Sequence, residues 1–180
     1  MAKVVFWSPF KDAVGCSHVA VAVSSIMGIT HKSTCLLMHS NFDTKKLESC
    51  FTLYNDLNTG DVLVDSSLGI GSVIRLLKSN KLTPDAIQNY AKPVLKGRLD
   101  ILYGMEASQG EDSEVLKNLP YIIKKSDEIY DVVFIDLTKT ANEEYVQEVL
   151  ADADIVVTVI NQDYIKIEEY FTKYANLELL

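Results

Sequence analysis

Short apolar runs alternate along the chain with segments in which apolar residues recur every three or four positions. Five runs have the length and composition of buried strands: Lys3–Trp7, Thr34–Met38, Arg98–Tyr103, Val132–Ile135 and Ile155–Ile160. Strands that are apolar throughout need cover on both faces, which is typical of parallel sheets. The pattern therefore predicts a three-layer α/β sandwich, with a mostly parallel sheet flanked by helices on both faces.

Segments with a helical period separate these strands. We expect helices at Ser17–Gly28, Lys45–Phe51, after Asp65 and Ser66 to Leu77, Thr83–Tyr90, Ser113–Ile129, Asn142–Leu150 and Asp163–Tyr174. Thr83 followed by Pro84 is typical of a helix start, and Gly28 of a helix end. Pro120 predicts a kink or a break inside its helix. The alternation in Leu53–Val64 predicts an excursion or a small hairpin.

Two of these helices carry apolar faces that we expect to be covered. In the first helix the predicted face consists of Val19, Ala20, Val23, Ile26 and Met27. In the last helix, core or interface packing is expected of Tyr164, Ile167, Phe171 and Tyr174.

Length and composition predict a single domain over residues 1–180, large enough for a substantial core. The three cysteines show no CxxC spacing and are odd in number, which argues against a disulfide framework. The three histidines give no zinc pattern. The chain enters its first strand without a signal-peptide core, and no apolar run reaches the length of a membrane span. We expect a reducing, cytoplasmic environment.

The net charge of −8 is unevenly distributed. Residues 1–120 contain 12 basic and 12 acidic side chains, whereas residues 121–180 contain 5 basic and 13 acidic ones. Such an acidic segment lacks the concentrated basic surface that a nucleic-acid backbone requires. A solvated acidic face is the simpler interpretation, and an acidic docking patch is the alternative.

The stretch Val4–His18 (VVFWSPFKDAVGCSH) predicts a strand, a loop and the start of a helix. This is the setting of a phosphate-binding loop, in which backbone N–H groups and the helix N-terminus surround an anion. Gly15 and Ser17 match the signature GxxxxGK followed by Ser or Thr, but Cys16 stands where the lysine belongs. Ligands of such folds bind at the carboxyl ends of the strands, where this loop lies.

The loop resembles the deviant Walker A motif of the ParA/MinD group of P-loop ATPases, KGGxGK followed by Ser or Thr. Lys11–His18 (KDAVGCSH) keeps the leading lysine, one glycine and the hydroxyl of that motif. DVVFID at 131–136 is similar to the Walker B strand, and ADADIVVTVINQD at 151–163 to a later strand ending in an Asn-containing loop. GIGSVIRLLKSNKLTPDAI and RLDILYG resemble the parts between these motifs. The resemblance covers most of the chain and implies a P-loop NTPase-like fold.

The resemblance also implies ATP and Mg²⁺ as ligands. The implied nucleotide-binding residues are Lys11, Asp12, Ala13, Val14, Gly15, Cys16, Ser17, His18 and Asn161. Ser17 would bind Mg²⁺, and Asp136 would hold the ion through water. The leading lysine of the family reaches phosphates across a dimer interface, which implies that role for Lys11. The family fold also continues beyond its fifth strand, so the resemblance implies that some C-terminal elements are absent.

The loop departs from the family motif where phosphate charge should be neutralised. Cys16 cannot supply the positive charge of the central lysine, and Asp12 introduces a negative one. Asp12 and Ala13 also add a Cβ where the backbone should approach phosphate closely. The acidic end of the family's second strand is replaced at the matching positions His39 and Asn41, with Asp43 further along. These departures predict weak or lost hydrolysis.

Each candidate also has an interpretation that needs no ligand. Asp136 is equally typical of a helix cap or a strand-end carboxylate, Lys11 of an exposed loop and Ser17 of a helix N-cap. A nucleophilic Cys16 would need a thiol pKa lowered by the helix N-terminus, with His18 as its nearest base. Gly69-Ile70-Gly71 lacks the third glycine of a dinucleotide fingerprint and predicts a helix start.

Three functions therefore compete. The resemblance implies a positioning or partition-type protein that forms a homodimer and recruits an unidentified protein partner, with little or no ATP hydrolysis. The alternative is a pseudo-ATPase scaffold that no longer binds nucleotide, and the third is a thiol enzyme built on Cys16. Direct DNA binding and membrane anchoring find no support, because the last third is acidic and the ending TKYANLELL is not a basic amphipathic helix.

Overall fold

The computed structural model describes residues 2–10, 15–40, 47, 50–51, 68–104, 112–137 and 144–174. One sheet contains the strands β1 (Ala2–Trp7), β2 (Cys35–His39), β3 (Lys92–Leu95), β4 (Leu99–Leu102), β5 (Val132–Leu137) and β6 (Ile155–Thr158). The helices are α1 (Cys16–Thr30), α4 (Ile70–Lys78), α5 (Pro84–Tyr90), α6 (Asp112–Ser126), α7 (Glu144–Ala151) and α8 (Tyr164–Lys173). The predicted helix at Lys45–Phe51 falls largely outside the described residues, and the predicted hairpin at Leu53–Val64 wholly so.

The strand order is β3-β4-β2-β5-β1-β6, and every neighbouring pair except β3–β4 is parallel. The five predicted strands are confirmed, and β5 extends two residues beyond its predicted end, so that Asp136 lies inside it. The antiparallel strand β3 was not predicted. Its sequence KPVL contains a lysine and a proline, and pairing through the turn at Gly97 (φ +68°) makes it a strand.

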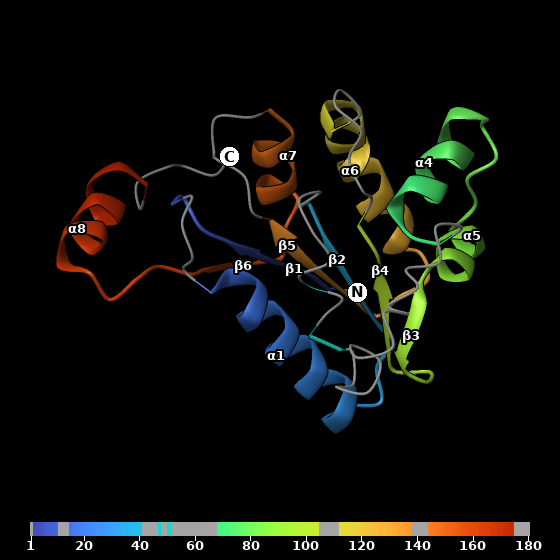
Figure 1. Cartoon of the computed structure of the whole chain (residues 1–180), viewed down its shortest axis with the longest axis horizontal. Helices are drawn as coiled ribbons and strands as arrows, with labels where there is room; N and C mark the ends of the chain where they lie inside the picture. Colours follow the sequence, from blue (N-terminus) through green and yellow to red (C-terminus); the bar gives the residue numbers. More distant parts are fainter. Residues whose placement is uncertain are drawn as a thin grey trace, which may run out of the picture.

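Helices cover both faces of the sheet, as predicted (Figure 1). Helix α1 packs against one face, where it contacts β1, β2, β4 and β5, and the mutually packed helices α4, α5, α6 and α7 cover the other. Side chains along the central strands alternate between two buried clusters: Val5, Val133 and Ile135 belong to one, Val4 and Phe134 to the other. The three-layer α/β sandwich is therefore confirmed.

Helix α1 reaches the sheet through small residues spaced four apart: Cys16, Ala20, Ser24 and Gly28 are buried. The predicted apolar face is confirmed for Ala20, which is buried, and for Val19 and Met27, which pack partly buried against the same cluster. It is wrong for Ile26, which is 61% exposed, and for Val23, which is exposed as well. Gly28 does not end the helix, which continues to Thr30. A Cβ at Gly28 would lie 3.2 Å from Leu95 Cδ1 and 3.2 Å from Leu99 Cβ, so this glycine permits close helix–sheet packing.

On the other face, two helix predictions need correction and one is confirmed. Helix α6 continues through Pro120, so the predicted break is wrong. Helix α4 begins at Ile70 rather than after Ser66, with Gly69 at its N-cap in a positive-φ conformation (φ +88°). A Cβ at Gly69 would lie 2.8 Å from the backbone oxygen of Tyr103, which excludes other residues there. Helix α5 begins as predicted, with Thr83 as N-cap and Pro84 at its first position.

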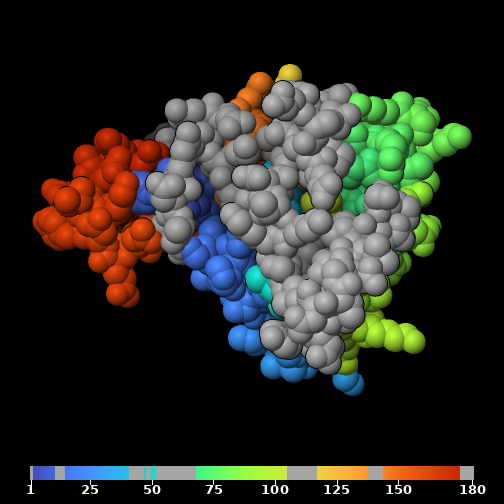
Figure 2. Space-filling model, viewed as in Figure 1, coloured from blue at the N-terminus to red at the C-terminus, as the bar shows by residue number. Residues whose placement is uncertain are grey.

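Helix α8 lies at the β6 side of the sheet, outside the two layers of helices that cover its faces (Figures 1 and 2). The prediction of core packing is wrong for Tyr164, which is 76% exposed, and for Phe171, which is exposed too. Tyr174, directly after this helix, packs against the cluster that contains Val5 and Trp7. Among the described residues, no helix is both long and apolar enough to cross a bilayer.

Candidate nucleotide site

The predicted strand, loop and helix are present at both ends of the phosphate-loop stretch. Strand β1 ends at Trp7, and α1 begins at Cys16 after Gly15, which has a left-handed backbone conformation (φ +81°, ψ 18°). Its carbonyl accepts the N–H of Val19 at 3.0 Å. Within the described residues, no side chain caps α1, and its first turn contains no acidic residue. Backbone N–H donors of that turn are the groups that would meet an anion. Lys11, Asp12, Ala13 and Val14 lie outside the described residues.

Ser17 and Asp136 meet at the carboxyl edge of the sheet. The Ser17 hydroxyl donates a hydrogen bond of 2.5 Å to Asp136 Oδ2. Because Gly15 holds the N-cap position, the interpretation of Ser17 as a cap is wrong. Asp136 lies within β5 and reaches the first turn of α1, so it is not a helix cap either. The structure thus joins the two predicted Mg²⁺ ligands.

Asp136 is an ionisable group in an unusually dry position. It is 1% exposed, and its Oδ1 is buried without a hydrogen-bond partner among the described residues. Burial raises the pKa of Asp136, while the Ser17 hydroxyl and the positive potential of two nearby histidines, His39 and His18, act in the opposite direction. A buried carboxylate oxygen without a partner fits a cation, which would supply the missing interaction.

Cys16 lies beside this carboxylate and is itself buried. Burial raises the pKa of the Cys16 thiol well above its ordinary value, and the negative charge of Asp136 raises it further. The helix N-terminus therefore does not produce a thiolate here. This opposes the thiol-enzyme hypothesis, since the thiolate is the reactive form. At the position of the motif's central lysine, the protein presents a neutral side chain.

In the described part of the site, two histidines contribute positive potential next to Asp136. His39 ends β2, opposite Asp136 in the β2–β5 register, and is buried. His18 follows Ser17 and is exposed. The sequence identified His39 only as a departure from an acidic family position; its placement next to Asp136 depends on the strand register. Asn41 and Asp43 lie outside the described residues.

Asn161 follows β6 and is exposed. Because β6 is parallel to β1, its carboxyl end lies at the same edge of the sheet as the phosphate loop. No hydrogen bond joins Asn161 to Ser17 or Asp136 within the described part of the chain. The structure therefore places Asn161 at the correct edge without bringing it into the Ser17–Asp136 cluster.

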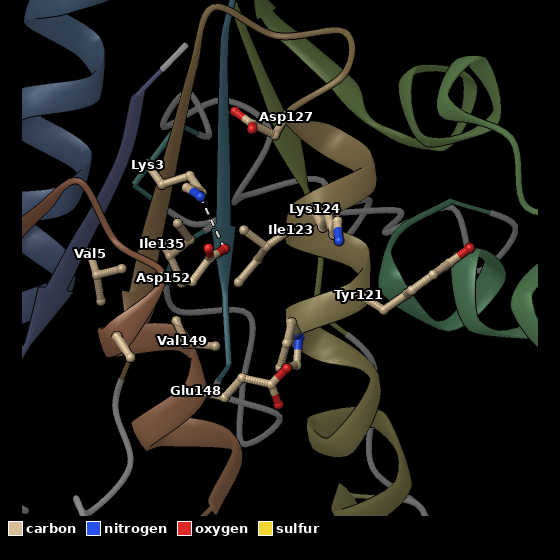
Figure 3. A pocket seen from close by; sticks show the side chains of 12 residues that line it. Lys3, Val5, Tyr121, Ile123, Lys124, Asp127, Ile135, Glu148, Val149 and Asp152 are labelled. Atoms are coloured by element: carbon tan, nitrogen blue, oxygen red, sulfur yellow. Dashed lines mark ion pairs between the residues drawn. The ribbon is translucent and has the colours of Figure 1, made fainter. Parts of the chain in front are cut away.

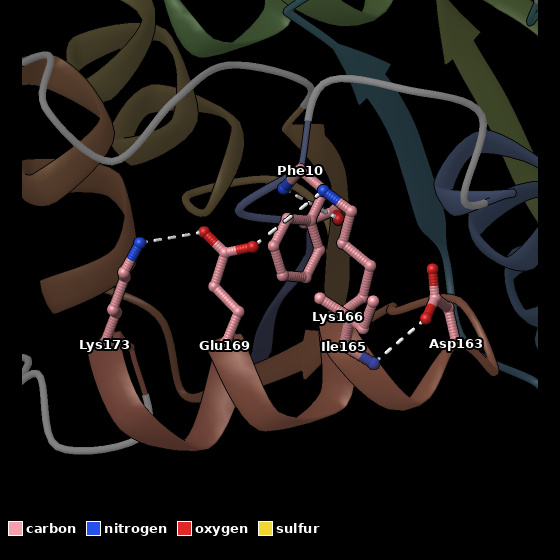
Figure 4. Close-up of polar contacts among 7 residues, drawn as sticks. Phe10, Asp163, Ile165, Lys166, Glu169 and Lys173 are labelled. Atoms are coloured by element: carbon pink, nitrogen blue, oxygen red, sulfur yellow. Dashed lines mark hydrogen bonds and ion pairs between the residues drawn. The ribbon is translucent and has the colours of Figure 1, made fainter.

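Aromatic packing holds the start of the phosphate loop against α8 (Figure 4). The ammonium of Lys166 lies 4.6 Å from the ring centroid of Phe10, and Phe10 packs edge-on against Tyr174 at 6.1 Å. Tyr174 also meets Trp7 edge-on at 6.3 Å. Sequence reasoning missed Lys166 and Phe10, and a local pattern offers no signal for a contact between segments this far apart.

The similarity of this chain to known proteins lies in its structure. No protein-family model matches the sequence, and no curated protein matches it. A ParA family ATPase from Chlorobium tepidum matches the structure with a TM-score of 0.63 at 13% identity, over 87% of this chain and 59% of that one. A putative plasmid partition protein from Borrelia burgdorferi bound to AMPPNP matches with 0.62 at 15% identity, over 95% and 66%. The chain has a ParA-like P-loop fold.

A third neighbour, the kinase domain of the Escherichia coli tyrosine kinase ETK, gives a TM-score of 0.63 at 13% identity, over 95% of this chain and 62% of that one. The chain thus spans 59% to 66% of the length of these three structures. Partition proteins and a tyrosine kinase share this fold, so the fold alone does not determine activity. A nucleotide-dependent activity of this chain would therefore depend on Ser17, Asp136 and the residues around them.

Could these residues hold the ligands of such proteins? Among the described residues, no group of three or more His, Cys, Asp or Glu side chains could enclose a metal ion. Mg²⁺ is commonly bound through one or two protein groups together with phosphate and water, so Ser17 and Asp136 are sufficient protein ligands. The donors fit Mg²⁺, whereas Cys16 fits the phosphates poorly.

A separate hollow of about 630 Å³ lies between α6 and α7, on the sheet face opposite α1 (Figure 3). Apolar side chains such as Ile123, Ile135 and Val149 line it, and charged ones surround them. One of its lysines, Lys3, is already paired with Asp152 at 3.0 Å. This hollow is separated by the sheet from the Ser17–Asp136 cluster and is not part of the candidate nucleotide site.

Proposed function

We propose that the protein is a ParA/MinD-like positioning protein that binds ATP with Mg²⁺ weakly and hydrolyses it slowly or not at all. The observation that carries the proposal is the 2.5 Å hydrogen bond between Ser17 and Asp136 at the carboxyl edge of a ParA-like sheet. This contact joins the hydroxyl after the phosphate loop to the acidic residue of β5. It supports a binding site that persists although the loop sequence has changed.

In this proposal each residue has a definite role. Gly15, Cys16, Ser17 and His18 present backbone donors of the first helical turn to the phosphates, together with Lys11, Asp12, Ala13 and Val14. Ser17 and Asp136 hold Mg²⁺, which would neutralise phosphate charge. Asn161 lies near the base, and Lys11 reaches the nucleotide of a second copy.

The weakness of the site follows from Cys16. A neutral thiol replaces a desolvated cation, and losing one partner of such a charge pair costs about 2–5 kcal/mol. The low end of that range corresponds to a roughly 30-fold loss of affinity. The same charge is missing when phosphate oxygens become more negative during transfer, so hydrolysis suffers as well.

Nucleotide-dependent homodimerisation and recruitment of a protein partner in the cytoplasm complete the proposal. The support is the fold shared with a ParA family ATPase and with a plasmid partition protein bound to AMPPNP. We do not propose direct DNA binding or membrane anchoring, because residues 121–180 are strongly acidic.

A scaffold that binds no nucleotide is the second candidate. It is favoured by one observation: the buried Cys16 thiol faces the Asp136 carboxylate, and burial disfavours the charged form of both. Such a pair resembles a stable core contact more than a phosphate site. The fold would then serve only as a surface for partner binding.

Calorimetric titration with ATP and Mg²⁺ distinguishes the two candidates. We expect weak binding by the wild type, at least about 30-fold tighter binding by Cys16→Lys, and none by Ser17→Ala with Asp136→Asn. Light scattering with and without nucleotide reports on dimerisation. If folded wild type and Cys16→Lys both fail to bind, the nucleotide proposal is wrong and the scaffold remains.

A further inference from the structure

The two edges of the sheet are built differently. The outer strand β3 carries Lys92 and Pro93, and its register with β4 is irregular between Pro93 and Leu95. Lysine, proline and irregular pairing are the devices by which proteins prevent another strand from adding to an edge. The β3 edge is therefore protected against strand addition.

The opposite edge, formed by β6, has none of these devices. The segment IVVTVI at 155–160 contains no charge, proline or glycine and is β-branched throughout. Ile155 is 52% exposed, and the remaining residues of β6 are only partly buried. Among the described residues, no strand pairs with the outer side of β6. An apolar edge of this kind is a template for strand addition.

The backbone of β6 shows which groups are available. The N–H of Asp154 donates to the carbonyl of Lys3 at 3.0 Å, toward β1. Within the strand, the register pairs Phe6 with Val157, and the N–H of Val159 donates to the carbonyl of Trp7 at 2.8 Å. Because N–H groups alternate in direction along a strand, that of Val157 also faces β1, and those of Val156 and Thr158 point to the outer side. They present donors to an extended segment, which pairs with them through main-chain hydrogen bonds.

Charge indicates the composition of that segment. Residues 144–174, which include β6 and α8, carry seven acidic and two basic side chains. Asp152 and Asp154 precede β6, and Asp163 begins α8; all three are exposed. Two copies paired antiparallel through β6 would bring acidic residues such as Asp152 and Asp163 together, which is unfavourable. A segment flanked by basic residues would instead meet opposite charge at both ends.

We propose that β6 is the docking edge for an extended, β-branched segment of another protein, flanked by lysine or arginine, which adds to the sheet beside β6. Tyr164 and Ile165, at the start of the helix that follows β6, are exposed and add apolar surface. The interaction does not require nucleotide, because neither the strand nor its acidic flanks belong to the Ser17–Asp136 cluster.

The test uses the full chain and a fluorescent peptide, Lys-Lys-Val-Thr-Val-Thr-Val-Lys-Lys, followed by anisotropy. A second peptide has proline at its central valine, and a third has glutamate in place of all lysines. We expect binding of the first peptide alone, weakened by salt. Hydrogen exchange of the Val156 and Thr158 amides should slow when the first peptide is added.

Three variants complete the test. Val156→Pro removes an outward N–H without changing net charge, and Ile155→Lys places a charge on the edge. Ile29→Lys makes the same charge change at a 72% exposed isoleucine of α1, next to Gly28 and thus toward the β3–β4 side. The dissociation constant should rise at least tenfold for the first two, whose folding is verified by thermal melting, and less than twofold for Ile29→Lys.

Four results would overturn the proposal. The lysine-flanked peptide fails to bind, or it binds equally well with proline at its centre and to Val156→Pro, which indicates charge attraction alone. Ultracentrifugation shows a dimer that Ile155→Lys dissociates, so that a second copy covers the edge. The Val156 and Thr158 amides are already as protected as that of Val157 in the monomer, so that this chain covers its own edge.

Discussion

The hydroxyl of Ser17 hydrogen-bonds to Oδ2 of Asp136 at 2.5 Å, although 119 positions separate the two residues along the chain. The bond connects the first turn of α1 to the carboxyl end of β5. It places a hydroxyl and a buried carboxylate where a P-loop fold binds its ligand, next to a cysteine that cannot carry positive charge.

Asp136→Asn should change how stability depends on pH. Burial raises the folded-state pKa of Asp136, so the stability contributed by this group is complete below its unfolded-state pKa and lost as pH rises through its folded-state pKa. Wild type should therefore lose stability relative to Asp136→Asn as pH rises above about 4, the ordinary pKa of an aspartate. Urea unfolding of both proteins from acidic to neutral pH measures the difference. Equal destabilisation of the variant at every pH would contradict this account.

Cys16 should react slowly with thiol reagents. Burial and the charge of Asp136 raise its pKa, whereas Cys50 is exposed and serves as an internal control. In the native protein at mildly alkaline pH, we expect iodoacetamide to modify Cys16 at least tenfold more slowly than Cys50, as followed by peptide mass spectrometry. In denaturant the two rates should become similar. Rapid labelling of native Cys16 would restore the thiol-enzyme hypothesis.

Gly28→Val should destabilise the fold. The added Cβ would lie 3.2 Å from both Leu95 Cδ1 and Leu99 Cβ, and further methyl groups would overpack the α1–sheet contact. We expect a loss of about 1–3 kcal/mol in the free energy of unfolding. Val23→Ala, at an exposed position of the same helix, is the matched control and should change stability by less than about 0.5 kcal/mol. If Gly28→Val is as stable as wild type, α1 does not pack closely through this residue.

Tyr130→Phe should destabilise the protein more at neutral than at acidic pH. The buried Tyr130 hydroxyl donates to Asp100 Oδ2 at 2.8 Å. Burial raises the pKa of Asp100 and this hydrogen bond lowers it, so the variant should raise the pKa further. The stability that Asp100 contributes to the fold is complete below its unfolded-state pKa and is lost as pH rises through its folded-state pKa. This loss becomes larger in the variant.

Urea unfolding at about pH 4 and about pH 7 checks this prediction, with an expected cost of about 1–3 kcal/mol at neutral pH and a smaller one at acidic pH. The double variant Tyr130→Phe with Asp100→Asn is the control, because it removes the carboxylate together with its donor. Titration at this position should therefore not lower the free energy of unfolding of the double variant between the two pH values. The same cost for Tyr130→Phe at both pH values would show that the Asp100 charge is not involved.

Local periodicity was sufficient for most of the fold. Apolar runs such as Val132–Ile135 identify central strands because both their faces are buried, and alternation with helices implies parallel pairing. Thr83 and Pro84 mark a helix start because their preferences act within one turn. The phosphate-loop stretch likewise predicted its strand and helix from neighbouring residues alone.

Tertiary packing decided what local pattern could not. Gly28 is typical of a helix end, yet it lies inside α1 because Leu95 and Leu99 need the space that a side chain would fill. The same close approach selects small residues for the buried stripe of α1 and leaves Ile26 exposed. Strand β3 exists only through pairing with β4, despite its lysine and proline.

For the candidate site, the order of residues specifies which groups are available: a hydroxyl at Ser17, a carboxylate at Asp136 and no lysine at position 16. Folding brings Ser17, Asp136 and His39 together. The parallel register of β2 and β5 pairs His39 with Asp136, and the start of α1 places Ser17 within hydrogen-bond distance of Asp136. Folding also decided the ionisation of Cys16. Thiol pKa depends on burial and on the nearest charge, and both are properties of the folded chain.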